Sequence, residues 1–121
     1  MQLIESNENL VNKLSAELSI LDSRLFKLDI FEDANEGLVI DIYLNLSRSK
    51  AQREIKIRFL EIEEYSFFYS KSHYFYYVER FKLFKNNEGY YISLDPFNEE
   101  NEIHFKDQDY VLCKSIQGYF I

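Results

Sequence analysis

The chain has 121 residues, of which 46% are hydrophobic and 29% are charged, and its net charge is −7. This length fits a single domain, residues 1–121, and the composition is that of a globular protein rather than a disordered one. The negative charge argues against nucleic-acid binding, because that affinity comes mainly from Lys and Arg on phosphates. An acidic surface suits a basic partner instead, or simply keeps the protein soluble.

The sequence also bears on the compartment of the protein. Its start, MQLIESNENL, lacks the basic and apolar regions of a secretory signal. No apolar run approaches the ~20 residues that a membrane helix requires. Cys113 is the only cysteine, so an internal disulfide cannot form. We therefore expect a cytoplasmic protein that does not enter a membrane.

The first predicted element is an amphipathic helix over residues 6–23. Leucines recur there at spacings of four, four and three, which places them on one stripe of a helix: Leu10, Leu14, Leu18 and Leu21. Ser6 or Asn7 can cap the helix at its start. Since the other face is polar, we expect the helix to pack by one side only.

After residue 23 the apolar period changes to two, which predicts strands. The clearest are residues 24–32 and 38–46, joined by a short loop in which Gly37 can take a positive φ, so they form a hairpin. A third strand covers residues 53–64. Its apolar phase shifts after Phe59, which predicts a bulge near that residue.

Three further runs complete the predicted sheet. Residues 74–85 and 90–94 form a second hairpin closed at Gly89, Pro96 ends its second strand, and residues 109–121 form a final strand or two. The loops are short and show no helical pattern, whereas parallel crossovers need about a dozen residues or more. The predicted fold is α+β: one N-terminal helix packed on a curved, mainly antiparallel meander sheet of about six strands.

Metal and cofactor motifs are absent from the sequence. Counted from Asp95, an EF-hand calcium loop would place Phe97, Glu100 and Lys106 at positions three, six and twelve, where the motif requires an oxygen ligand, Gly and Glu. His73, His104 and Cys113 do not have the short spacings of zinc ligands. We therefore expect no metal and no cofactor.

Catalytic motifs are absent as well. Cys113 lies in an alternating apolar run, which indicates a buried residue, and no GxSxG elbow or glycine-rich phosphate loop occurs. We therefore expect a protein that is not an enzyme.

The charges are distributed unevenly along the chain. From residue 86 onward there are two bases, Lys106 and Lys114, against seven acids: Glu88, Asp95, Glu99, Glu100, Glu102, Asp107 and Asp109. Residues 48–58 show the opposite bias, with one acid and five bases: Arg48, Lys50, Arg53, Lys56 and Arg58. Because the net charge is negative, we interpret this basic stretch as a solvated face, or as a partner for acids elsewhere in the fold, rather than as a nucleic-acid site.

Residues 65–77, YSFFYSKSHYFYY, are unusually aromatic. A sheet can bury every second ring, and the others are available for a wet, partly buried contact with a partner. Together with the acids that follow Pro96, they provide the candidate partner-binding residues: Tyr69, Tyr74, Tyr76, Asn98, Glu99, Glu100, Glu102, Asp107 and Asp109.

Residues 74–121 also carry a family resemblance. An aromatic strand ending in SLDP, an acidic turn and the following DQDY strand resemble small bacterial proteins of the immunity type, which are associated with polymorphic or contact-dependent toxins. The resemblance implies a protein that binds and neutralises a cognate toxin, for example a basic nuclease, and it assigns no residue roles. Two alternatives stay open. One is a small-molecule or peptide-binding module with an aromatic-lined concave sheet. The other is an enzyme of unrecognised class in which His73 or His104 meets an acid. The sequence does not indicate an oligomeric state.

Overall fold

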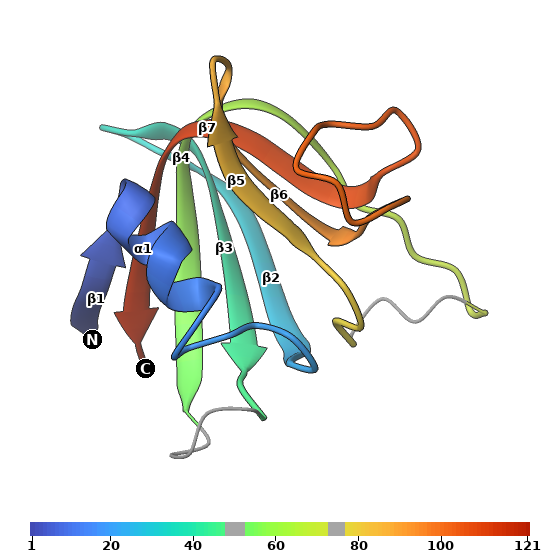
Figure 1. Ribbon diagram of the computed structural model, residues 1–121. Coiled ribbons are helices and arrows are strands. Elements are labelled where there is room, and N and C mark those ends of the chain that lie inside the picture. Colours follow the sequence, from blue (N-terminus) through green and yellow to red (C-terminus); the bar gives the residue numbers. More distant parts are fainter. Residues whose placement is uncertain (48–52, 73–76) are drawn as a thin grey trace.

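The computed structural model describes residues 1–47, 53–72 and 77–121. Its helix and strands are β1 (Gln2–Ser6), α1 (Asn7–Leu14), β2 (Arg24–Asp33), β3 (Gly37–Asn45), β4 (Glu54–Ser66), β5 (Lys82–Asn86), β6 (Gly89–Asp95) and β7 (Gln108–Phe120) (Figure 1). The strands form one antiparallel sheet, and α1 packs against it. The predicted α+β class is confirmed.

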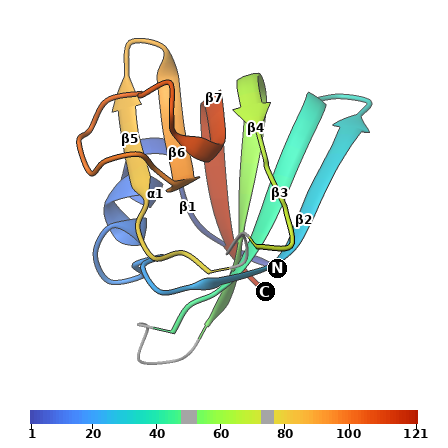
Figure 2. The ribbon, with the colours of Figure 1, turned by 90° about the vertical axis from the view of Figure 1, so that its right-hand side faces the viewer.

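The strand order is β2-β3-β4-β7-β6-β5, and β1 also pairs with β7. The connectivity therefore differs from a simple meander, because the last strand of the chain lies between β4 and β6. β7 pairs with β4 on one side, while on the other side residues 108–113 pair with β6 and residues 117–120 pair with β1. The sheet bends across β7, so that β5 and β6 lie on the opposite side of the molecule from β2 and β3 (Figure 2).

The predicted helix is shorter than expected and is preceded by a strand. Asn7, at φ 52°, turns the chain from β1 into α1, and its side-chain Oδ1 accepts the backbone N–H of Ile116 at 3.0 Å. The side chain thus satisfies a β7 donor at the point where β1 leaves the sheet. The helix ends at Leu14, and the N–H of Leu18 donates to the carbonyl of Lys13 at 2.9 Å in the following turn. No helix in the described ranges is long and apolar enough to cross a bilayer.

The core lies between the sheet and α1. Leu10 and Leu14 of α1 are fully buried against alternate residues of the strands, including Ile42 of β3 and Ile57 of β4. Gly118 allows this close packing, because a Cβ at that position would lie 2.5 Å from Leu10 Cδ1. The apolar alternation read from the sequence therefore faces the helix, as amphipathic strands require.

The predicted hairpins are confirmed, with Gly37 and Gly89 at φ 77° and 133°. The predicted bulge lies slightly later than expected. The pairing of β4 with β7 shifts between Ile62 and Glu64, and Glu61 takes φ 52°, so that both Phe59 and Ile62 can pack against the core. Of the long strand predicted over residues 74–85, β5 forms the last part, and residues 73–76 lie outside the described residues.

Candidate functional site

The connection between β6 and β7, residues 96–107, is the segment that the sequence singled out for function, and we call it the acidic loop. β6 ends at Asp95, immediately before Pro96, which has no N–H to continue the ladder. The loop folds back beside β5 and β6 (Figure 1). It covers the side of these strands that points away from the core, because Leu83 and Ile92 face the core while Lys82 and Tyr91 face the loop.

The carboxylate of Asp107 holds both ends of the acidic loop. It accepts the backbone N–H of Phe97 at 2.9 Å and that of His104 at 3.0 Å. It also accepts the hydroxyl of Tyr91 at 2.8 Å, and the Nζ of Lys82 lies 3.1 Å from each of its oxygens. One buried side chain thereby joins the loop to β5 and β6.

Hydrogen bonds stabilise the ionised form of Asp107 in this network. Burial by itself would raise the pKa of Asp107, but the hydrogen bonds from His104, Phe97, Tyr91 and Lys82 outweigh it and hold the pKa below its usual value. Burial and the bond to Asp107 raise the pKa of the Tyr91 hydroxyl, so it stays a donor. Lys82 Nζ gains a further acceptor in the carbonyl of Glu102, at 2.8 Å. The network is therefore a structural anchor.

Asp107 and Asp109, which the sequence predicts as partner-binding residues, are buried. Their exposed fractions are 5% and 2%, because each carboxylate is drawn inward by donors of the fold. Asp109 Oδ1 accepts the backbone N–H of Phe68 at 2.8 Å. Asp107 and Asp109, around the start of β7, consequently tie the acidic loop and the aromatic stretch to the sheet.

The other predicted residues of the acidic loop lie at its surface. Glu99, Glu100 and Glu102 are exposed, and Asn98 is half-buried. The side-chain Oδ1 of Asn98 accepts the backbone N–H of Glu100 at 3.3 Å, which closes a local turn. Three carboxylates are thus available to a partner on a loop whose ends are fixed.

Sequence reasoning missed the apolar side chains of the same loop. Phe105 is 87% exposed, and Phe97 and Ile103 are exposed as well. The His104 ring stacks between the two phenylalanines, with centroid distances of 4.2 Å to Phe97 and 4.8 Å to Phe105. The ammonium of Lys106 lies 5.2 Å from the Phe97 ring centroid. The signal was present in the sequence: large apolar residues within a polar loop that shows no strand period.

The aromatic stretch is only partly described. Tyr69 is exposed, as are Tyr65 and Phe68, whereas Phe67 packs against the core. The other two aromatic candidates, Tyr74 and Tyr76, lie outside the described residues, as does His73. Tyr69 is therefore the one aromatic candidate of this stretch whose side chain the structure places at the surface.

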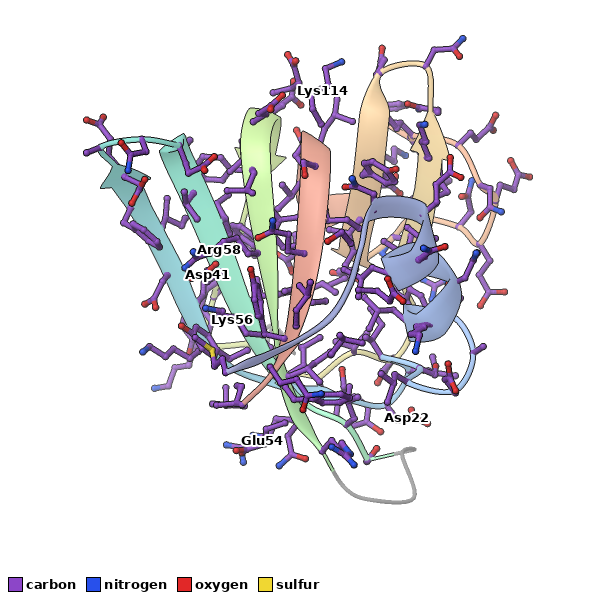
Figure 3. All side chains as sticks on the ribbon, turned by 90° about the vertical axis from the view of Figure 1, so that its left-hand side faces the viewer. Asp22, Asp41, Glu54, Lys56, Arg58 and Lys114 are labelled. Atoms are coloured by element: carbon purple, nitrogen blue, oxygen red, sulfur yellow. The ribbon has the colours of Figure 1, made fainter. Side chains whose placement is uncertain are left out.

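Two bases of the basic stretch, Lys56 and Arg58, have an internal partner. Arg58 on β4 donates to both oxygens of Asp41 on β3, each at 2.8 Å, and Lys56 Nζ lies 4.0 Å from the same carboxylate (Figure 3). Burial lowers the pKa of Lys56, while Asp41 opposes that shift. Lys56 is buried rather than solvated, because it lies against β3 and the Tyr119 ring, 4.9 Å from its centroid. Arg48 and Lys50 lie outside the described residues.

Two of the groups considered for catalysis, Cys113 and His104, are engaged in the fold. Cys113 is fully buried, and burial raises the pKa of its thiol to about 12, which leaves almost no thiolate at neutral pH. The Nδ1 of His104 accepts the backbone N–H of Lys106 at 3.0 Å. Across residues 1–47, 53–72 and 77–121, no three His, Cys, Asp or Glu side chains gather as metal ligands.

Three cavities lined by described residues are small or wide open. One of about 200 Å³ lies beside Arg80 and Pro96, and one of about 170 Å³ lies beside Phe105. A wider depression of about 440 Å³ at Asn7 and Tyr90 is open to solvent. Typical small-molecule sites are enclosed and measure roughly 300–1,000 Å³. None of these three cavities is both enclosed and of that size.

Comparison with known proteins identifies no relative of this chain. No family model matches it, and neither the curated proteins nor the solved structures contain a match. Function has therefore to be inferred from the acidic loop and from the chemistry of the side chains that it exposes.

Proposed function

We propose that this chain is a non-catalytic interaction protein that binds a basic protein through its acidic loop. The observation that carries the proposal is the contrast within the loop. Asp107 and Lys82 form a buried anchor, while Glu99, Glu100 and Phe105 are exposed. A loop that is already ordered loses little conformational entropy on binding. Its acids can steer a basic partner, and its exposed ring can supply a desolvated contact.

A cognate toxin is the partner that we propose. The support is the resemblance of residues 74–121 to immunity-type proteins, together with the net charge of −7. A toxin that acts on nucleic acid carries a basic surface for phosphates, and an acidic loop competes for that surface. In this proposal the chain acts in the cytoplasm and neutralises the toxin by covering it, without turnover.

The alternative, a small-molecule or peptide-binding module, is less well supported. The side of the sheet that faces α1 is filled by core side chains, among them Ile42, Ile57 and Val111. Exposed aromatic rings occur on the acidic loop and near the end of β4, as with Phe105 and Tyr69, and also on β2, as with Phe26. An aromatic-lined hollow on the concave face would require an open space where the core is packed.

Charge reversal tests the proposal. A tagged chain first retrieves its partner from the source cells at low salt, and the partner is then purified for kinetic measurements. The variant Glu99→Lys/Glu100→Lys/Glu102→Lys should lower the association rate and weaken binding by about tenfold or more at low salt.

The matched control is Glu17→Lys/Glu32→Lys/Glu36→Lys, which changes the net charge equally at exposed positions away from the loop. Equal losses in both variants would show that only net charge matters. Unchanged binding in the loop variant would refute the proposal. Neutralisation would be supported if the wild-type chain inhibits the activity of the purified partner and the loop variant does not.

A further inference from the structure

A cavity of about 170 Å³ lies between the acidic loop and strands β6 and β7. Its lining includes the aromatic residues Tyr91 and Phe105, with His104 and Leu112, and the acidic residues Glu64 and Glu88. Tyr91 is buried, whereas both glutamates are exposed. The cavity therefore combines a buried aromatic floor with two acids at its solvent side, each from a different element of the fold.

One acid of the cavity, Glu64, is oriented by a neighbouring hydroxyl, and Lys114 has acceptors outside the lining. The hydroxyl of Tyr110 donates to the carboxylate of Glu64, and this bond raises the pKa of Tyr110 to about 12. An ionised carboxylate has lone pairs for further donors. Lys114 Nζ donates to the backbone carbonyl of Glu88 at 2.7 Å and lies 3.8 Å from the carboxylate of Glu63.

The Phe105 ring, which lines the cavity, already lies near a cation, and so does the Phe97 ring outside the lining. Lys106 Nζ lies 5.7 Å from the centroid of the Phe105 ring and 5.2 Å from that of Phe97. An ammonium or guanidinium over an aromatic face is stabilised by the ring quadrupole. The walls and the acids of the cavity thus both favour a positively charged occupant.

We propose that this cavity receives one arginine side chain of the basic partner, an inference that rests on the proposed function. The volume is smaller than a small-molecule site and suits a single side chain. A guanidinium is flat, stacks on rings such as Phe105, and donates in pairs to carboxylates such as Glu64. A neutral apolar side chain would cover the two carboxylates without giving them a donor, which is unfavourable. The cavity is the point at which the acidic loop selects arginine.

N-acetyl-arginine amide is a direct probe of the cavity, because it needs no identified partner. Titration into the ¹⁵N-labelled chain should shift the amide resonances of Ile103, Phe105 and Leu112. N-acetyl-lysine amide should bind more weakly, and N-acetyl-norleucine amide should cause no saturable shifts. The variant Glu64→Gln/Glu88→Gln keeps an acceptor for Tyr110. It should bind the arginine probe about tenfold more weakly than wild type.

The matched control is Glu99→Gln/Glu100→Gln, which removes the same charge from residues that do not line the cavity. It should leave the affinity for the arginine probe within about twofold of wild type. Equal weakening in both variants, or equal shifts with norleucine, would overturn the inference. The arginine probe could fail to bind while the charge-reversal variant of the acidic loop still binds the basic partner more weakly than wild type. That result would refute this inference alone. Failure of both experiments would refute the proposed function as well.

Discussion

Replacing Asp107 with asparagine tests the anchor of the acidic loop with almost no change in side-chain volume. In the wild type, the carboxylate receives donors from Phe97, His104, Tyr91 and Lys82. The asparagine amide group would turn its own N–H groups toward at least one of these donors, and Lys82 would be left buried without a counter-ion. Removing one partner of a buried ion pair costs about 3–5 kcal/mol. A domain has only about 5–15 kcal/mol in total, so Asp107→Asn should be marginally stable.

A double-mutant cycle separates the ion pair from the rest of the network. Lys82→Met leaves Asp107 with three donors that are not charged, so it should cost less than Asp107→Asn. In the double variant the unpaired ammonium is gone. The variant Lys82→Met/Asp107→Asn should therefore be no less stable than Asp107→Asn alone, and the two losses should not add. Urea unfolding followed by tyrosine fluorescence or circular dichroism measures all four free energies.

Amide hydrogen exchange locates the effect. In Asp107→Asn the amides of Phe97 and His104 should lose more protection than a core amide such as that of Ile42, because the loop is released before the sheet opens. A loss of unfolding free energy below about 1 kcal/mol, the value of an ordinary hydrogen bond, would refute the anchor. Additive losses in the cycle would also refute it.

Three further predictions concern pH, packing and thiol chemistry. The folded-state pKa of Asp107 is lowered, so its contribution to the free energy of unfolding is complete above the ordinary Asp pKa of about 3.9. That contribution is lost as the pH falls from this value toward the folded-state pKa. The stability difference between wild type and Asp107→Asn should therefore shrink in that range, and a constant difference in acid titrations of unfolding would contradict this. Gly118→Ala should lower the free energy of unfolding, measured by thermal unfolding, by about 1–3 kcal/mol, because the new Cβ clashes with Leu10. The double variant Gly118→Ala/Leu10→Ala should lose less than the sum of the two single losses. Cys113 should resist alkylation at pH 8 in the folded chain and react in denaturant, since burial raises its pKa to about 12; rapid alkylation without unfolding would argue against this placement.

Local patterns in the sequence were sufficient for the hairpins and the fold class. The alternation in β3 and the positive φ at Gly37 and Gly89 depend on neighbours in the chain, so they can be read from the sequence. The position of β7 could not be read in this way, because pairing with β4, β6 and β1 depends on segments distant in sequence. For the same reason the helix was predicted too long. Leu18 packs against the core from a turn, which the leucine spacing alone cannot distinguish from a helical turn.

The acidic loop shows the same division at the level of single residues. Its acids, its proline boundary and the candidates Glu99, Glu100 and Glu102 follow from composition and turn chemistry, which the sequence determines by itself. Whether an acid is exposed was decided only by the tertiary structure. Asp107 is buried because donors from β5, from β6 and from both ends of the loop converge on it, whereas Glu99 meets solvent. A buried carboxylate is stable only where such donors replace water, and their convergence is a property of the folded chain.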